Sequence, residues 1–360
     1  MTAPDLSPFR ELGIEPLIAE KPAEPRDSSR LMVIDRKSGV IRHKFFKDLP
    51  DFLESGDCLV INESKVWKAR IYAAKSAGSS LPAGRAERGQ GTELLLVESA
   101  DKSFLSWNLL CRKTKPGASY TLDGGIKAEC LSRNADGSYL FAFSSPLTEK
   151  YLNENGTVPL PGYIEKKRKE KGLDVHLDKD DSSYQTVYAS ENGSIAAPTA
   201  GFHFTGELLE RLRRKGVKTA KITLHVGWGT FKPIRGPVEE HKMLPEFCSV
   251  SETAAETVNA AKRAGGRVAA VGTSSVRTLE AMAGEKGALK PGSQRTGIFI
   301  YPGYAFRLPD IFITNLHVPD SPPLAMTAAF CGKELLLKAY AEAVELKYRF
   351  YSYGDSTLII

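Results

Sequence analysis

The stretch Ser194–Phe231, SIAAPTAGFHFTGELLERLRRKGVKTAKITLHVGWGTF, decides the fold because it sets one helix and one strand between two glycine-bearing turns. Thr205 is a preferred N-cap residue, and Gly216 suits the left-handed position that ends a helix. Between them, apolar residues follow the spacing of one buried helix face: Leu208, Leu209 and Leu212. Lys218–Val226 then has the pattern of a strand. A helix that leads directly into a strand predicts α/β architecture, and the polar turn after the strand predicts a functional site.

The composition is that of a folded chain large enough for two domains. The chain has 360 residues, of which 42% are hydrophobic, and an ordinary domain takes about 150 residues. The formal net charge is +6 and the pI is near 8.9. This basic excess fits an anionic partner such as RNA, although it is also common in enzymes without one.

The cysteines and the first residues bear on the cellular compartment. Five cysteines lie far apart and form no Cys-x-x-Cys pair, which argues against a zinc cage and a disulfide framework: Cys58, Cys111, Cys130, Cys248 and Cys331. The opening MTAPDLSPFRELG lacks the basic start and apolar core of a signal peptide. No apolar run approaches the ~20 residues that a membrane helix needs. We therefore expect a cytoplasmic protein with no membrane partner.

The composition changes after Lys75. Residues 76–91, SAGSSLPAGRAERGQG, are small, polar and glycine-rich, as in a mobile loop. Short alternating strands follow at Glu93–Val97, Phe104–Cys111, Ser119–Leu122, Ile126–Leu131 and Tyr139–Phe143. Closure into a small antiparallel β-barrel would remove the exposed edges of so many short strands. Because α/β patterns resume afterwards, we predict an inserted barrel domain at residues 67–159, within a discontinuous catalytic domain at 1–66 and 160–360.

Two charged segments have open interpretations. Pro159–Asp181 holds a basic run followed by aspartates, which we interpret as a solvated linker, with phosphate contact as the alternative. The cluster of Arg26, Asp27 and Arg30, just before an apolar strand, could hold the charges of a ligand or brace a turn.

The strands predicted in the second half of the chain all end in polar residues. They are Lys218–Val226, Arg267–Val271, Gly297–Tyr301 and Asp310–Thr314. Because the carboxyl ends of parallel strands share one edge of a sheet, the groups that follow them should converge. These groups are His225-Val226-Gly227-Trp228-Gly229-Thr230, Gly272-Thr273-Ser274-Ser275 with Arg277, Tyr301-Pro302-Gly303-Tyr304, and Asn315 with His317. Their convergence predicts an enzyme.

Two of these turns have a structural and a functional interpretation. The turn Gly272–Ser275 opens a helix, so its amides and hydroxyls could hold a carboxylate, a phosphate or ribose hydroxyls, or could only cap the helix. Gly227 and Gly229 could let the backbone approach a flat ligand stacked on Trp228, or could form a tight turn around a core tryptophan.

The histidines of the α/β part favour proton transfer and ligand contact over metal binding. His203, His225, His241 and His317 stand in polar turns, with no cysteine at metal spacing. We therefore expect no bound metal. The sequence also lacks a Gly-x-Ser-x-Gly elbow, a P-loop and a dinucleotide fingerprint, which excludes the commonest hydrolase, NTPase and dehydrogenase classes.

Eight blocks carry a resemblance that extends over nearly the whole chain. They are EPRDSSRL from Glu24, AAPTAGFHFT, TLHVGWGTF, EEHKM, VGTSSVR, IYPGY, TNLHVP and YRFYSYGDSTLI. With these blocks in order, the sequence resembles the S-adenosylmethionine:tRNA ribosyltransferase-isomerase family of queuosine biosynthesis. The resemblance implies a large, irregular, barrel-like α/β domain interrupted by a small antiparallel β-barrel, in agreement with the insertion inferred above.

The resemblance also implies a reaction. The family transfers and isomerises the ribosyl part of S-adenosylmethionine onto 7-aminomethyl-7-deazaguanine at the wobble position of a tRNA, giving epoxyqueuosine with loss of adenine and methionine. Because the donor is a sulfonium, the protons on the adjacent ribose carbon are acidic, and a base can form an ylide before adenine departs. The expected partners are tRNA and S-adenosylmethionine, with no further cofactor, and the expected state is a monomer.

We assign the site residues from these blocks as hypotheses. His225 or, failing it, His203 is the candidate base, and His317 is a third catalytic candidate. Thr273, Ser274 and Arg277 are candidates to hold the methionine carboxylate or ribose of the donor. Further candidate substrate contacts are Asp27, Arg30, Asn62, Arg70, Gly227, Trp228, Gly229, Thr230, His241, Tyr301, Asn315 and Asp355.

Some positions depart from the family pattern. Asn62-Glu63-Ser64-Lys65-Val66-Trp67-Lys68-Ala69-Arg70 stands where members typically have Asn-Asp-Thr-Arg-Val-x-Pro-Ala-Arg. Ser356-Thr357 and Pro322-Pro323 also differ, and we expect these changes to alter packing rather than chemistry. Two other classes remain open: an RNA-binding module that has lost catalysis and, without the resemblance, a methyltransferase.

Overall fold

The structure is a computed structural model that describes residues 5–75, 91–285 and 287–360, without the side chains of Thr230 and Phe231. It divides into two units. The larger comprises residues 1–65, 161–191 and 197–360, and the smaller comprises 66–160 and 192–196. The inserted domain was predicted at residues 67–159, and each end lies within one residue of the observed segment 66–160. Residues 192–196, which were not predicted to belong to it, also group with the smaller unit. Most of the predicted loop, residues 76–90, lies outside the described residues.

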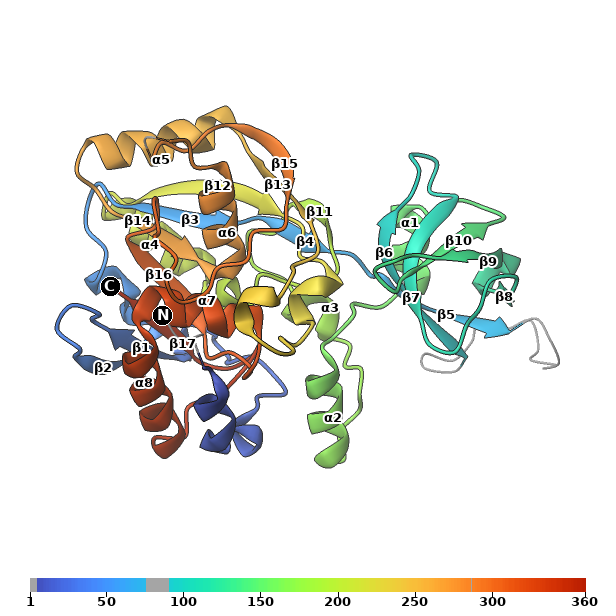
Figure 1. Ribbon diagram of the computed structural model, residues 1–360, viewed down its shortest axis with the longest axis horizontal. Helices are drawn as coiled ribbons and strands as arrows, with labels where there is room; N and C mark the ends of the chain where they lie inside the picture. Colours follow the sequence, from blue (N-terminus) through green and yellow to red (C-terminus); the bar gives the residue numbers. More distant parts are fainter. Residues whose placement is uncertain (1–4, 76–90, 286) are drawn as a thin grey trace. The chain divides into compact units, whose positions relative to one another are not determined.

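The larger unit contains a nine-stranded mixed sheet with β15 and β2 at its edges. Its order is β15 (Gly292–Thr296), β13 (Glu246–Val250), β12 (Lys218–Leu224), β3 (Cys58–Asn62), β14 (Val268–Val271), β16 (Ile311–Asn315), β17 (Ser356–Ile359), β1 (Arg30–Ile34) and β2 (Ile41–Phe45). Neighbours among β12, β3, β14 and β16 are parallel, whereas β17 runs antiparallel to β16. Figure 1 shows β17 beside β1, with which it pairs in parallel.

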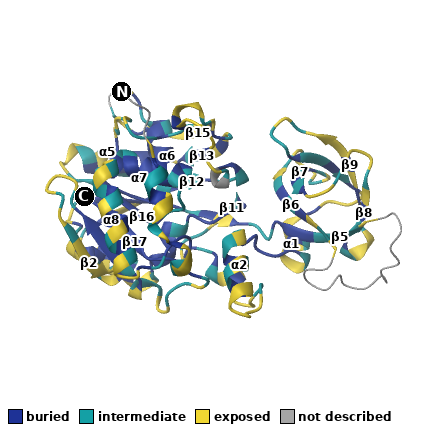
Figure 2. Ribbon diagram, turned by 60° about the horizontal axis from the view of Figure 1, so that its bottom comes forward, coloured by how far each residue is buried: buried dark blue, intermediate teal, exposed yellow. Residues whose placement is uncertain are grey.

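The middle of the sheet is buried on both faces. Every residue of β3, β14, β16 and β17 is buried, as expected for central strands covered on both sides. Figure 2 shows this for β16 and β17. One face packs in a core that includes Leu208 and Leu212 of α4 (Gly206–Arg214). The other described helices of the larger unit are α2 (Gly162–Glu170), α3 (Asp180–Ser183), α5 (Glu252–Arg263), α6 (Gly272–Met282), α7 (Pro322–Cys331) and α8 (Lys333–Glu345).

Local signals explain the ends of α4 and α5. The Thr205 side chain accepts a hydrogen bond from the Leu208 amide, and Gly216 has φ +92°. Ser251 caps α5 in the same way through the Ala254 amide. The predicted helix, its cap and the strand after it are therefore confirmed.

The smaller unit is a closed antiparallel barrel, which confirms the predicted insertion of a small β-barrel. Its strands are β5 (Arg70–Lys75), β6 (Thr92–Ser99), β7 (Ser106–Cys111), β8 (Ser119–Thr121), β9 (Lys127–Arg133) and β10 (Tyr139–Phe143). Alternate side chains of β7 are buried, as the period of a half-buried strand requires. Helix α1 (Glu149–Asn155) belongs to the same unit, and β4 (Ser64–Val66) and β11 (Glu191–Ser194) form a separate two-stranded sheet.

Two predicted elements are wrong. Gly297–Tyr301 is not a strand: β15 ends at Thr296, and the apolar residues after it pack without ladder bonds. The basic run is not a loop, because Gly162–Glu170 forms α2 and Arg168 within it is buried. Among the described residues, no helix is long and apolar enough to cross a membrane.

Candidate functional site

One edge of the large sheet gathers most of the predicted site residues. We define the functional edge as the carboxyl ends of β12, β3, β14 and β16 together with the starts of β17, β1 and β13. The strand directions place these ends together, since Asn315 at the end of β16 pairs with Ser356 at the start of β17. The predicted convergence therefore holds for the groups after β12, β14 and β16.

His225 lies just after β12 and is held by Ser64. The Ser64 hydroxyl lies 2.8 Å from Nδ1 of His225, and the imidazole stacks on the Phe247 ring with centroids 5.4 Å apart. Ser64 is fully buried, whereas His225 is only partly buried. A buried hydroxyl on one ring nitrogen fixes the orientation of the imidazole.

Asn62 holds Ser64 and His225 at their spacing by binding the backbone beside them. Its side-chain amide donates to the Leu224 carbonyl at 2.9 Å, and its side-chain oxygen accepts from the amides of Leu224 and Ser64 at 3.0 and 3.1 Å. The ends of β3 and β12 are thereby tied to one another. Asn62 is completely buried and satisfied by backbone groups, so the structure gives it a positioning role.

Glu246 and Arg277 form a buried ion pair beside His225. Arg277 Nη1 contacts Glu246 Oε2, while Arg277 also donates to the carbonyls of Ile298 and Thr296. The other oxygen of Glu246 accepts from the Gly227 amide at 2.7 Å. Both charged groups are at most 4% exposed. The pair therefore fixes the Gly227 turn and compensates the charge of Arg277.

The start of α6 offers unsatisfied donors. Gly272 has φ +81°, and no side chain caps this helix. Ser274 and Ser275 follow, and their buried hydroxyls have no hydrogen-bond partner among the described residues. Amides at a helix start combined with unsatisfied hydroxyls suit an anionic or hydroxylated ligand.

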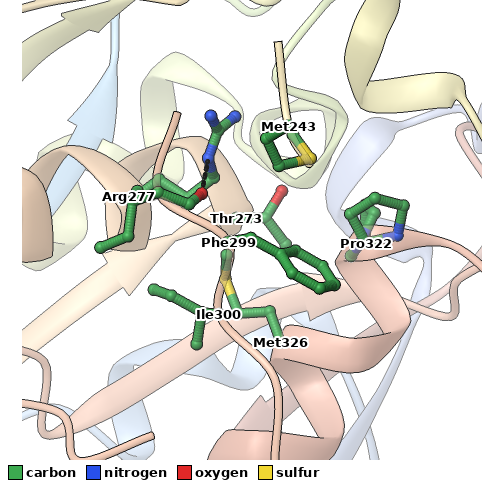
Figure 3. Close-up of a pocket in the computed structure, with 9 residues that line it drawn as sticks. Met243, Thr273, Arg277, Phe299, Ile300, Pro322 and Met326 are labelled. Carbon is green, nitrogen blue, oxygen red and sulfur yellow. Dashed lines mark hydrogen bonds between the residues drawn. The ribbon is translucent and has the colours of Figure 1, made fainter. Parts of the chain in front are cut away.

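A small pocket, part of it open to solvent, adjoins this helix. Its lining residues are Met243, Thr273, Arg277, Ile298, Phe299, Ile300, Pro322, Pro323 and Met326. Figure 3 shows the Thr273 hydroxyl turned toward Met243, with Phe299 and Pro322 around the same space. The pocket is mostly apolar, and Thr273 and Arg277 contribute its polar side chains.

His203 is buried at the functional edge between protein partners. Its Nδ1 lies 2.7 Å from the Ser29 hydroxyl and its Nε2 lies 3.2 Å from Asn315 Nδ2. Asn315 Nδ2 also donates to the Tyr351 carbonyl, which identifies that atom as the amide nitrogen. Nε2 of His203 therefore accepts, and Nδ1 carries the proton toward Ser29. Burial lowers the pKa of His203 to about 3, so the ring is neutral near pH 7.

Asp355 organises the starts of β17 and β1. Its carboxylate accepts from the backbone amides of Arg30 and Arg349 at 3.0 and 2.8 Å, and from both arginine side chains. Arg30 also lies over the Tyr348 ring at 4.0 Å. Nearby, Asp27 accepts from the Thr205 hydroxyl at 3.4 Å. Asp355 and Arg30 therefore connect the starts of β17 and β1 at the functional edge.

The glycine turn after β12 packs tightly. A Cβ on Gly229 would lie 2.8 Å from Leu244 Cβ, and Lys232 Nζ lies 3.8 Å from the centre of the Trp228 ring. This cation contacts the ring that the sequence suggested as a stacking surface. The side chain of Thr230 lies outside the described residues.

His241, Tyr301 and His317 differ in their surroundings. The ring of Phe299 contacts both His241 and Tyr301, with centroid distances of 4.9 and 5.4 Å. Burial lowers the pKa of His241, and its Nε2 has no partner among the described residues. His317 Nε2 lies 2.7 Å from Thr314 Oγ1, and burial lowers its pKa to about 3. The structure thus favours a packing role for His317.

Arg70 belongs to the smaller unit. It is 7% exposed, donates to the Leu160 carbonyl at 3.2 Å and pairs with Glu93 at 3.6 Å. These contacts brace the barrel.

Sequence reasoning missed Ser64, Glu246 and Arg349. Ser64 lies two residues after Asn62, which was selected, so the strand-end pattern could have included it. Glu246 begins an antiparallel strand, for which that pattern gives no signal. Among the described residues, no group of three or more His, Cys, Asp or Glu side chains is arranged to hold a metal ion.

Comparisons with known proteins place the chain in a family. The family model described as Queuosine biosynthesis protein matches residues 14–359. An S-adenosylmethionine:tRNA ribosyltransferase-isomerase from Caldanaerobacter subterraneus subsp. tengcongensis is 45% identical over 96% of this chain and 97% of its own. The protein of the same name from Symbiobacterium thermophilum is 44% identical over 96% of each chain.

A solved structure agrees with these relatives. The crystal structure of an S-adenosylmethionine tRNA ribosyltransferase from Thermotoga maritima matches with a TM-score of 0.52 and 34% identity, over 96% of this chain and 97% of that one. The chain therefore belongs to the queuosine biosynthesis protein family, whose relatives are S-adenosylmethionine:tRNA ribosyltransferase-isomerases, and it is an enzyme of that family.

Proposed function

We propose that this chain transfers and isomerises the ribosyl part of S-adenosylmethionine onto 7-aminomethyl-7-deazaguanine in a tRNA anticodon, releasing adenine and methionine. One observation carries the proposal beyond family membership. The functional edge joins an imidazole oriented by a buried hydroxyl, His225 with Ser64, to a helix start with unsatisfied donors. The reaction needs these two features, a base and a holder for the donor.

His225 is the proposed base. Its ring is only partly buried and is held by the Ser64 hydroxyl, so we assign His225 to take the proton from the ribose carbon beside the sulfonium. His203 is less suitable, because it is buried and burial lowers its pKa to about 3. We propose that His203 instead holds the Ser29 hydroxyl in place through its Nδ1.

The start of α6 is the proposed holder of the donor carboxylate or ribose. Ser274 and Ser275 supply hydroxyls that lack a partner among the described residues, and the helix start favours negative charge. Arg277 acts through its ion pair with Glu246, which fixes the Gly227 turn. Thr273 faces the adjoining pocket.

The remaining proposed residues divide into two groups. Asp27, Gly227, Trp228, His241 and Tyr301 stay candidates for substrate contact. Arg30, Asn62, Asn315 and Asp355 are candidates that position others, since their polar atoms bind backbone or neighbouring side chains. The proposed reaction uses S-adenosylmethionine as a substrate and calls for no metal. Because its acceptor is tRNA, we place the enzyme in the cytoplasm, and the monomeric state stays a prediction.

The reaction itself is tested with donor and acceptor together. The whole chain is incubated with S-adenosylmethionine and an anticodon stem-loop RNA that carries 7-aminomethyl-7-deazaguanine. We expect free adenine and an RNA mass gain that corresponds to the ribosyl group. A methyl-sized gain would identify a methyltransferase instead, and RNA binding without any mass gain would identify a binding module.

The base assignment is tested by His225→Ala. General-base catalysis contributes typically ~10²-fold or more, so we expect the rate of adenine release under saturating substrates to fall by at least that factor. His43→Ala is the matched control, because His43 lies in the middle of β2 and its ring bonds to Tyr348 and Glu342 rather than to Ser64 or His225. A loss below about tenfold in His225→Ala would exclude His225 as the base.

A further inference from the structure

The outer strands β12, β13 and β15 leave one face of the large sheet open beside the proposed base. Along β12 and β13, buried side chains alternate with more exposed ones, so only one of the two faces is covered. Glu246 lies on the covered face, where it pairs with Arg277 of α6. On the other face, Leu59 of β3 packs in the core around α4, whereas Thr219, its partner on β12, is exposed. The cover that α4 gives to this face therefore ends at β3.

The strand registers bring five side chains together on this uncovered surface, close to the functional edge. Thr223 pairs with Ser249 and Ser249 with Ser293, while Phe247 pairs with Arg295. We name this set of five the open face. We propose that the open face binds the single-stranded anticodon loop of the acceptor RNA, and that one base of the loop stacks on Phe247. The inference rests on the proposed function and refines it, because it states which surface receives the acceptor.

Phe247 both contacts the proposed base and faces solvent. Its ring lies against the His225 imidazole, with centroids 5.4 Å apart and an angle of 22° between the planes. The residue is nevertheless 37% exposed. Single exposed aromatic residues are common, but this one is held beside the group that is assigned to take the proton. A nucleobase stacked on Phe247 would lie next to the site of reaction, which is where the acceptor is needed.

The polar groups of the open face suit RNA. Arg295 is exposed, and none of the five side chains is a carboxylate. Glu246, the acid of the three strands, is buried on the opposite face. The hydroxyls of Thr223, Ser249 and Ser293 can bond to base edges. A positive group, hydroxyls and an aromatic ring on an uncovered sheet are a combination by which proteins hold unstacked RNA bases.

The loop of the acceptor fits the open face better than the stem does. Bases within a double-stranded stem are already stacked on one another, so they would not use the Phe247 ring. Loop bases can unstack and expose both their faces and their edges. The single-stranded loop is therefore the expected occupant.

The test measures the Kd of the whole chain for an anticodon stem-loop RNA by fluorescence anisotropy at low salt, without the donor, so that no reaction occurs. Phe247→Ala removes the stacking surface, and the Kd should rise at least about fivefold. Phe247→Leu keeps apolar volume without an aromatic face and should lose as much, whereas Phe247→Trp should stay within about twofold of the parent chain. Phe45→Ala is the matched control, because Phe45 is 48% exposed on β2, at the opposite edge of the sheet.

Two further kinds of RNA identify the contact. A duplex with the stem sequence and no loop should bind equally to the parent chain and to Phe247→Ala, which also shows that the variant is folded. Among stem-loops that each carry one abasic loop position, one should bind the parent chain more weakly, and Phe247→Ala should lose nothing further on that RNA. Unchanged loop binding in Phe247→Ala, full affinity in Phe247→Leu, equal losses on loop and duplex, or the same further loss on every abasic RNA would overturn the inference.

Ribosyl transfer by the unaltered chain is scored separately. Transfer without dependence of loop binding on Phe247 defeats only this inference, whereas Phe247-dependent loop binding without transfer defeats the proposed function.

Discussion

Ser64 acts on the proposed chemistry through one hydroxyl. Ser64→Ala removes the group 2.8 Å from His225 Nδ1 while keeping the backbone bond to Asn62. A single hydrogen bond contributes about 0.5–1.5 kcal/mol, so we expect the turnover number to fall roughly threefold to tenfold, with the KM for the donor nearly unchanged. Measurement of the pH–rate profile should also show a changed acidic limb, where a general base loses its proton, because the partner of the imidazole has changed.

Ser64→Thr is the matched variant for this prediction. Threonine keeps the hydroxyl and is the residue that the family pattern has at this position, so turnover should recover to within about twofold of the parent enzyme. Equal losses in the alanine and threonine variants would show that packing, rather than the hydroxyl, is what matters at Ser64.

Buried histidines make stability depend on pH. Burial lowers the pKa of His317 from 6.5 to about 3, so the unfolded chain binds more protons between these values. Stability is therefore complete above about pH 6.5 and falls as the pH drops below it. His317→Gln keeps a hydrogen-bonding group without this titration. Urea unfolding at pH 7.5 and pH 5 should show a smaller loss in the variant, by roughly 1–2 kcal/mol. Identical losses would contradict the assigned shift.

Sequence could identify His225 and Ser274 but not the roles of their neighbours. Strand ends predict which groups share an edge, and this identified the residues after β12, β14 and β16. The tautomer of His203 depends on an amide that also bonds to Tyr351, a contact that chain order does not show. The ion pair of Arg277 with Glu246 likewise joins a helix to an antiparallel strand 31 positions away.

At the level of elements, α2 depends on one internal charge. Arg168 donates to both oxygens of Asp180 at 2.7 and 2.8 Å and to the carbonyls of Glu20 and Val175. Arg168→Met leaves a buried carboxylate unpaired, so we expect the free energy of unfolding to fall by about 3–5 kcal/mol. Urea denaturation measures this loss. Lys169→Met, on the exposed side of α2, should change it by less than about 0.5 kcal/mol, and similar effects in both variants would refute the special role of Arg168.

Helix α2 also shows which features local sequence patterns cannot predict. The five predicted barrel strands and the capped helix α4 agree with the structure because alternation, turns and caps are local. A basic run looks solvated until its long-range partner is known, and the partner of Arg168 is a separate helix. Gly297–Tyr301 has the apolar run of a strand, but its residues Ile298, Phe299 and Ile300 line a pocket instead. Periodicity alone cannot distinguish a buried strand from an apolar segment of this kind.

At the scale of the whole molecule, the basic excess should govern RNA binding. The net charge of +6 fits a polyanionic acceptor, and each phosphate contact releases counterions. We expect the Kd for the anticodon stem-loop to rise steeply between about 50 and 200 mM KCl. Adenine binding is the control, because an uncharged ligand should keep its affinity. A salt-independent RNA affinity would exclude a major role for phosphate contacts.

The α/β class of the larger unit was accessible from sequence, but the order of its strands was not. Individual strands could be located, but their order could not, because β3 lies between β12 and β14 while preceding both by long stretches of chain. The inserted barrel separates these partners further.

The place of β17 also affects how the protein is made. Leu31 pairs with Ser356, so the first strand of the sheet gains this neighbour only after more than 300 further residues have been synthesised. Until then β1 has only β2 beside it, and the apolar strand β3 waits for β12 and β14. Contacts so distant in sequence fold slowly and leave apolar surface exposed to aggregation. Bacterial production of this enzyme should therefore benefit from slow translation or added chaperone, and loss of residues 356–359 should prevent folding of the finished chain.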